Sequence, residues 1–171
     1  MATLDADGLL NEATELIRAS DSEGLPLRLL GGLAVRVLCP SACAAPFDRS
    51  YSDIDCVGPE DSPRLQRFLS GLGWEPPREF NMYNGDRRLL FVSPRGAKID
   101  LFVGRFSMCH SFDFAGRLPV GSLAAHPEDI LLTKLQIHEI NEKDLVDTAC
   151  LLHDRGPEVE GGIDAAYVAK A

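Results

Sequence analysis

The sequence predicts an α/β domain in which short strands and amphipathic helices follow one another along 171 residues. Two patterns carry this prediction. Short apolar runs rich in β-type residues, with single acids inside them, indicate strands in the middle of the chain. Apolar residues at helical spacing indicate helices near both ends, and a hydrophobic content of 45% is enough for one core of ordinary size.

The first third of the chain predicts a helix, a strand and a second helix, in that order. An aspartate can cap the first helix, whose apolar stripe extends over residues 5–19. Residues 27–30 form an apolar run of strand length, and residues 33–38 continue at helical spacing. The Gly31-Gly32 pair between them predicts a tight turn.

The middle third predicts a strand, a helix and a hairpin. Residues 53–57 are β-type, and residues 62–72 predict a helix with a proline in its first turn. Two further β-type runs, residues 88–93 and 98–103, are joined by the turn-forming residues 94–97. The hairpin would place its second strand alongside a neighbouring strand.

The last third is predicted to be a loop followed by helices. Residues 104–119 have mixed character, and helices are expected to start at His126-Pro127 and at Asn141. We therefore divide the chain into a domain over residues 1–125 and a helical segment over residues 126–171 that packs on it.

Three acids stand inside the predicted strands. Because strand side chains alternate between faces, Asp53 and Asp55 point the same way, where like charges repel and resist desolvation. Asp100 is a third acid in an apolar β-type run. Three strand carboxylates are a natural cradle for a hard, oxygen-loving cation such as Mg²⁺. A solvent-facing strand edge is the alternative explanation of this short pattern.

The residues that precede these acids extend the pattern. The Gly31-Gly32 turn is followed by a helical run, by residues 49–52, by Asp53-Ile54-Asp55, and later by Asp100. In this order they resemble the nucleotidyltransferase superfamily, whose palm fold is shared with DNA polymerase beta. The resemblance is to the small bacterial branch, which contains the aminoglycoside and lincosamide, the minimal and the abortive-infection toxin-like nucleotidyltransferases.

The resemblance implies a fold and an activity. The fold would be a palm, with a small mixed, twisted sheet, helices packed mainly on one face, and a helical C-terminal segment. The activity would be transfer of a nucleoside monophosphate from an NTP to a hydroxyl, with pyrophosphate leaving. Asp53, Asp55 and Asp100 would hold two Mg²⁺ or Mn²⁺ ions. Asp100 could also accept the proton of the acceptor hydroxyl.

The resemblance also implies a nucleotide-binding set. Gly31 and Gly32 would line the triphosphate, with Arg49 and Ser52 close by. The chain departs from the family pattern at Gly32, where many members have a serine, so that a hydroxyl contact to phosphate would be missing. A second departure is the small-residue insertion at residues 39–46.

Lys134, Asp144 and Asp147 resemble the helix pair of the toxin-like members. There the lysine would meet phosphate in a catalytic role, and the aspartates would lie near the site. Asp144 and Asp147 stand three positions apart and share one helix face. Snorkelling of the lysine to water and helix capping by an aspartate are the alternatives that need no ligand.

The net charge and the composition restrict the kinds of binding partner that we expect. A net charge of −9 weighs against nucleic acid and suits a small or cationic acceptor next to the NTP. Without an apolar run of about 18 residues or a signal pattern, no membrane partner is expected and the protein should be cytoplasmic. A homodimer is compatible with the family, and further C-terminal helices beyond Ala171 are conceivable.

Other functions and a metal site stay open as alternatives. The chain could be a toxin-like transferase acting on tRNA or protein, a nucleotide-binding module that has lost turnover, or a non-catalytic interaction protein. Five cysteines at irregular spacing fit a reducing cytosol. Cys39 and Cys43 could be drawn as a zinc site with Cys109-His110, but free buried thiols are expected instead.

Overall fold

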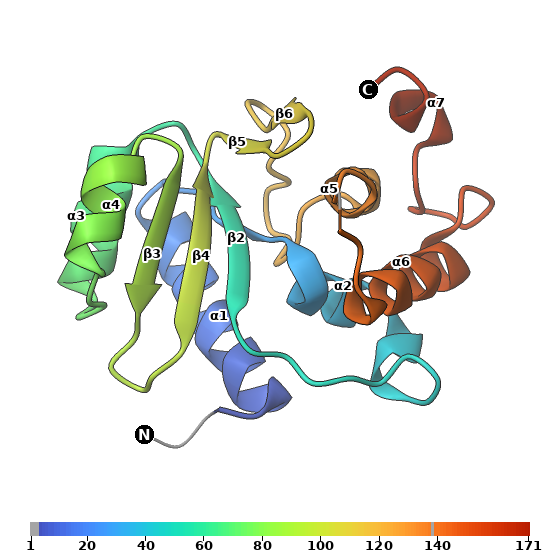
Figure 1. The fold of residues 1–171 in the computed structure, drawn as a ribbon, viewed down its shortest axis with the longest axis horizontal. Coiled ribbons are helices and arrows are strands. Elements are labelled where there is room, and N and C mark those ends of the chain that lie inside the picture. The colour runs from blue at the N-terminus through green and yellow to red at the C-terminus, as the bar shows by residue number, and fades with distance from the viewer. Residues whose placement is uncertain (1–3, 138) are drawn as a thin grey trace.

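A mixed four-stranded sheet forms the centre of the structure (Figure 1). The computed structural model describes residues 4–137 and 139–171. The sheet has the order β1-β2-β4-β3, with β2 parallel to β4 and the other neighbours antiparallel. Its strands are β1 (Arg28–Leu29), β2 (Ile54–Gly58), β3 (Arg88–Val92) and β4 (Lys98–Val103). The mixed sheet and the α+β class agree with the sequence prediction.

Helices flank this sheet, and a small two-stranded sheet adjoins it. The helices are α1 (Ala6–Ser22), α2 (Gly31–Leu38), α3 (Ser62–Gly71), α4 (Arg78–Asn84), α5 (Pro127–Leu135), α6 (Glu142–Arg155) and α7 (Ala165–Val168). A 3-10 turn, η1 (Pro40–Cys43), follows α2, and the small sheet consists of β5 (Arg105–Ser107) and β6 (Ser111–Asp113). In Figure 1, α3 and α4 lie on the β3 side, whereas α2, α5 and α6 cluster on the β2 side.

The two faces of the sheet have different chemistry. Ile54 lies opposite Ile99 in the parallel β2–β4 pair, and their face is apolar and buried. Because side chains alternate, the next pair, Asp55 and Asp100, faces the other way. The antiparallel β3–β4 register adds Leu90 to this second face, opposite Asp100. One face therefore builds the core, and the other carries the acids.

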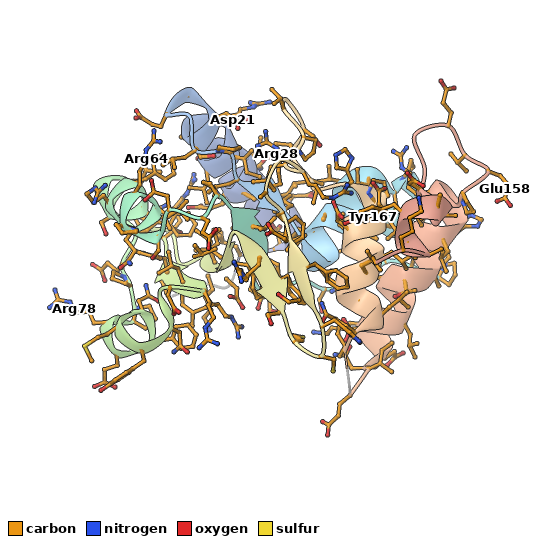
Figure 2. All side chains as sticks on the ribbon, turned by 90° about the horizontal axis from the view of Figure 1, so that it is seen from above. Asp21, Arg28, Arg64, Arg78, Glu158 and Tyr167 are labelled. Carbon is orange, nitrogen blue, oxygen red and sulfur yellow. The ribbon has the colours of Figure 1, made fainter. Side chains whose placement is uncertain are left out.

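The first helix covers the apolar face. Asp5 caps α1 through a hydrogen bond from the Gly8 N–H to its Oδ1 atom, at 2.8 Å, and the helix places an apolar stripe in the common core. Its C-terminal end is tied to the sheet by Asp21, which pairs at 2.9 Å with the buried Arg28 of β1 (Figure 2). The sequence prediction of this helix is confirmed.

The Gly31-Gly32 pair is part of α2, not a turn ahead of it. The helix was expected to begin at Leu33, but it begins at Gly31, which has φ of +59°. The Leu30 N–H donates to the Asp55 carbonyl at 2.8 Å, so the chain leaves the sheet and enters the helix within one residue. A positive φ at this point explains the glycine.

Three other expectations need correction. Asp53 precedes β2 instead of opening it, because the strand pairing starts with Ile54. The short helix α4 was not expected, since its stability comes from contacts with β3 instead of from apolar periodicity. The loop predicted over residues 104–119 contains β5 and β6, which are too short for a sequence pattern to reveal.

The side chain of Asn81 forms two hydrogen bonds with the outer edge of β3, where no further strand of the described residues pairs. Its Nδ2 donates to the Leu90 carbonyl at 2.9 Å, and its Oδ1 accepts from the Leu90 N–H at 2.8 Å. Both backbone groups of the residue opposite Asp100 are thus satisfied by α4.

We expect Asn81→Ala to lower the free energy of unfolding by about 1–3 kcal/mol, because it leaves a partly buried N–H and C=O of β3 without partners. Urea denaturation followed by circular dichroism measures this loss. The control is Asn84→Ala, which removes one hydrogen bond to Phe80 inside the same helix. Equal losses in the two variants would contradict the proposed bridging role of Asn81.

Candidate functional site

The carboxylates of Asp55 and Asp100 lie in register on neighbouring strands. They occupy paired positions of the parallel β2–β4 ladder, on the face that the core helices leave uncovered. A Cβ atom built on Gly31 would lie 2.0 Å from Asp55 Oδ2, so only a glycine lets α2 start against this carboxylate. Asp53, which is exposed, completes the group just ahead of β2.

The surroundings of the Asp55 carboxyl disfavour its ionised form. Burial, and then the negative charges of Asp53 and Asp100, raise its pKa from 3.8 to about 7. Lys134 and Arg88 act in the opposite direction but do not compensate. Within the described part of the chain, Asp55 forms no side-chain hydrogen bond or ion pair. A cation bound next to Asp55 would therefore compensate a negative charge that the described residues leave unpaired.

Asp100 is paired with Arg88 of β3. The Arg88 Nε donates to Asp100 Oδ1 at 2.7 Å, and its Nη2 contacts Oδ2 as well. The guanidinium also lies over the rings of Phe102 and Phe80, at 5.4 and 5.8 Å from their centroids. Arg88 thus binds both carboxylate oxygens of Asp100.

Gly32 makes room for the guanidinium of Arg49. A Cβ atom at residue 32 would lie 1.9 Å from Arg49 Nη2. The guanidinium binds both oxygens of Asp147 at 2.7 and 2.6 Å and stacks on the Tyr51 ring, 4.4 Å from its centroid. The space that a side chain at residue 32 would need is thus occupied by the Arg49 guanidinium.

Lys134 of α5 is buried between two acids of α6. Its Nζ atom lies 2.8 Å from Asp144 Oδ1 and 2.7 Å from Asp147 Oδ2. Although burial alone would lower it, these two carboxylates hold the pKa of Lys134 above its usual value. The lysine does not snorkel to water, and the cap of α6 is Asn141, not an aspartate.

A small cavity of about 140 Å³ joins the acids to these cations. It is polar, and besides Asp53 and Asp55 its lining includes Gly32, Arg49, Tyr51, Ser52, Lys134, Asn141, Lys143 and Asp144. Ser52 is exposed and donates to Asp53 Oδ1 at 3.0 Å. We call this space the cationic cavity, because three basic side chains line it.

A second cavity, of about 200 Å³, lies on the other side of Asp55. It shares Asp55, Lys134 and Asp144 with the cationic cavity, and Arg88 and Asp100 also line it. The rest of its wall consists of Gly31, Thr133 and five apolar residues, namely Leu30, Phe102, Phe106, Met108 and Ile137. We call it the apolar cavity. Asp55 therefore lies where a cationic and an apolar compartment meet.

All the residues expected to bind the nucleotide or the metal ions line one of these cavities or contact a residue that does. Asp53, Asp55 and Asp100 come together, whereas Asp147 is a contact of Arg49 and Lys134 and does not line either space. Sequence reasoning missed Arg88 and Tyr51. Strand alternation from Leu90 to Arg88 could have placed the arginine on the acidic face; nothing comparable marks Tyr51.

We expect Asp55→Asn to stabilise the metal-free protein at pH 8 by roughly 1–4 kcal/mol, since each pKa unit corresponds to about 1.4 kcal/mol. A carboxyl whose pKa is raised on folding costs stability as it ionises, so the gain should develop between pH 4 and 7 and be absent below pH 4. Unfolding in the presence of a chelator at several pH values measures it. Asp86→Asn, which removes an exposed acid, is the control, and an equal gain there would contradict the role of burial.

No described helix is both long and apolar enough to cross a membrane. No protein-family model matches the sequence. Nor does any curated protein match it.

Solved structures do align with the chain, at low identity. The lincomycin-bound lincosamide antibiotic adenylyltransferase LnuA has a TM-score of 0.54 and 15% identity, covering 81% of this chain and 93% of its own. The antibiotic-resistance factor ANT(2'')-Ia has a TM-score of 0.54 and 16% identity, covering 84% and 82%. An antigenic nucleotidyltransferase-like protein from Paracoccidioides brasiliensis has a TM-score of 0.50 and 17% identity, covering 87% and 77%. The chain therefore has the nucleotidyltransferase fold that its residue pattern resembles.

Proposed function

We propose that the protein is an enzyme that transfers a nucleoside monophosphate from an NTP to a hydroxyl of a small molecule and releases pyrophosphate. The observation that carries this proposal is the convergence of Asp53, Asp55 and Asp100 between a cationic and an apolar cavity. A phosphoryl-type transfer needs mainly positioning and charge neutralisation, which these two compartments can supply.

The three carboxylates fit divalent cations. All donors are oxygens, as Mg²⁺ and Mn²⁺ prefer, and the raised pKa of Asp55 marks a carboxylate that lacks a cation. Asp53, Asp55 and Asp100 would hold the ions, and Asp100 would exchange its contact with Arg88 for a metal contact. When bound, the ions would neutralise the charge on the phosphates and the leaving pyrophosphate.

The cationic cavity suits the triphosphate. Arg49, Lys134 and Lys143 line it, and the first two are held in place by Asp144 and Asp147. Bidentate anchoring fixes the Arg49 guanidinium before a ligand arrives, so that less side-chain entropy is lost on binding. The positive charge of Arg49 replaces the hydroxyl that Gly32 lacks. Ser52 lines the same cavity, whereas Gly31 lines the other cavity next to Asp55.

The apolar cavity suits the acceptor. Asp100 lies at its edge, where it can take the proton of a bound hydroxyl once Arg88 has moved aside. Among the described residues, the remaining acid of this cavity, Asp144, is neutralised by Lys134 at 2.8 Å. With Asp55 and Asp100 bound to metal ions, a polycation would find no unpaired carboxylate here. We therefore favour a hydroxylated acceptor with an apolar portion that packs on Phe102 and Phe106.

A direct test combines nucleotide binding with product mass. Each NTP is titrated with Mg²⁺ or Mn²⁺ by calorimetry, and then incubated with lincomycin, with a polycationic aminoglycoside and with neutral aryl glycosides. We expect metal-dependent NTP binding, and an acceptor that gains the mass of a nucleoside monophosphate. Absence of metal-dependent binding for every NTP would overturn the proposed function.

The double variant Asp53→Asn, Asp55→Asn should lose the stabilisation that an NTP and Mg²⁺ give together. At a ligand concentration 100 times Kd, that stabilisation is about 2.7 kcal/mol, visible as a higher Tm. The matched control is Glu75→Gln, Asp86→Asn, which removes two exposed acids and should keep the shift. A full shift in the active-site double variant would exclude these acids as metal ligands.

Gly32→Ala should weaken NTP binding about tenfold or more, because the new Cβ atom displaces the Arg49 guanidinium from its place 1.9 Å away. If the glycine acts through Arg49, the pair Gly32→Ala, Arg49→Ala should bind no more weakly than Arg49→Ala alone. Calorimetry measures both. Gly71→Ala, at a glycine with open space around it, is the control. Additive losses would mean that Gly32 contacts the nucleotide independently of Arg49.

A further inference from the structure

Two buried cysteines and one aspartate form a second group of potential metal ligands, outside the cavities described above. Cys39 ends α2, and Cys150 and Asp154 lie on α6. The Sγ atoms of the two cysteines and a carboxylate oxygen of Asp154 all lie within 4.8 Å of one another. The two thiols are 0% and 1% exposed, so this is an interior site.

The geometry fits a tetrahedral metal ion. Cys150 and Asp154 stand four positions apart on one helix and therefore share a face, and Cys39 approaches them from another element. Two thiolates about 2.3 Å from a zinc ion at tetrahedral angles lie roughly 3.8 Å apart, which is within the observed spread of these atoms. Sulfur ligands select zinc over magnesium.

The aspartate is already oriented for this task. The Ser41 N–H donates to Asp154 Oδ2 and the Ser41 hydroxyl to Oδ1, both at 2.8 Å. Each oxygen keeps a further lone pair. Hydrogen bonds of this kind fix a carboxylate ligand before a metal binds.

We propose that Cys39, Cys150 and Asp154 bind a structural zinc ion, with solvent in the fourth position. Such an ion would join the end of α2 and the start of η1 to α6. The same helix carries Asp144 and Asp147, which hold Lys134 and Arg49. The ion would thereby fix the element on which the phosphate-binding cations depend. From the sequence, free thiols were expected in preference to a zinc site of Cys39 and Cys43 with Cys109-His110, and the group around Cys39 contains none of those other residues.

The test titrates Co²⁺ into the reduced full chain in excess Mg²⁺, because cobalt–thiolate bonds absorb in the near ultraviolet and Mg²⁺ does not compete for sulfur. We expect a charge-transfer band that saturates at one equivalent and is abolished by Zn²⁺. Binding should also release protons, since both thiols must ionise. A titration without a saturating band would overturn the proposal.

Variants assign the band to residues. Cys150→Ser should abolish the band. Asp154→Asn, which serves as the test if the cysteine variant does not fold, should weaken Co²⁺ binding at least tenfold. Cys109→Ser, at an exposed cysteine elsewhere in the chain, is the matched control and should keep the band. The double variant Asp53→Asn, Asp55→Asn should keep it too, whether or not the proposed transferase activity is correct. A band that survives Cys150→Ser and Asp154→Asn would exclude this site.

Discussion

The pairing of Asp55 with Asp100 across two parallel strands is the constraint on which the rest of the site depends. Parallel register places the two carboxylates side by side, and strand alternation aims both away from the core. Gly31 is needed because α2 begins against Asp55, and Arg88 of the next strand forms an ion pair with Asp100. The apolar face of the same strands anchors this arrangement in the core, so the repulsion cannot relax by rotating a strand.

Lys134 of α5 and Arg49, which lies ahead of β2, supply the opposite charge next to these acids. Lys134 and Arg49 share Asp147, and Lys134 also contacts Asp144, which gives two cations and two anions in one largely buried network. Buried ion pairs add little net stability, because desolvating the charges costs about as much as their attraction returns. Their value here is positional. The network keeps two basic groups beside three acids without letting them collapse into direct ion pairs with Asp55.

Local pattern predicted the elements that have their own periodicity, and missed those that depend on partners. The strands with Asp55 and Asp100, the capped helix α1 and the helices after Pro127 were all predicted correctly, because alternation, capping and apolar spacing are local properties. The pair between Arg88 and Asp100 depends on cross-strand register, and α4 depends on the two hydrogen bonds of Asn81 to β3. The start of α2 at Gly31 was missed for the same reason, since Asp55, distant in sequence, decides it.

Both edges of the central sheet are closed by the chain itself. At β3, the Asn81 amide satisfies Leu90, and the backbone of Glu75 exchanges two hydrogen bonds with Val92 at 2.8 and 2.9 Å. At β1, Leu29 bonds to Leu123 and Ala125. A sheet without a free edge offers no template for a strand from another molecule. The central sheet is therefore hindered, at these positions, from adding a strand of another copy, which lowers its tendency to grow into fibrils when the protein is concentrated.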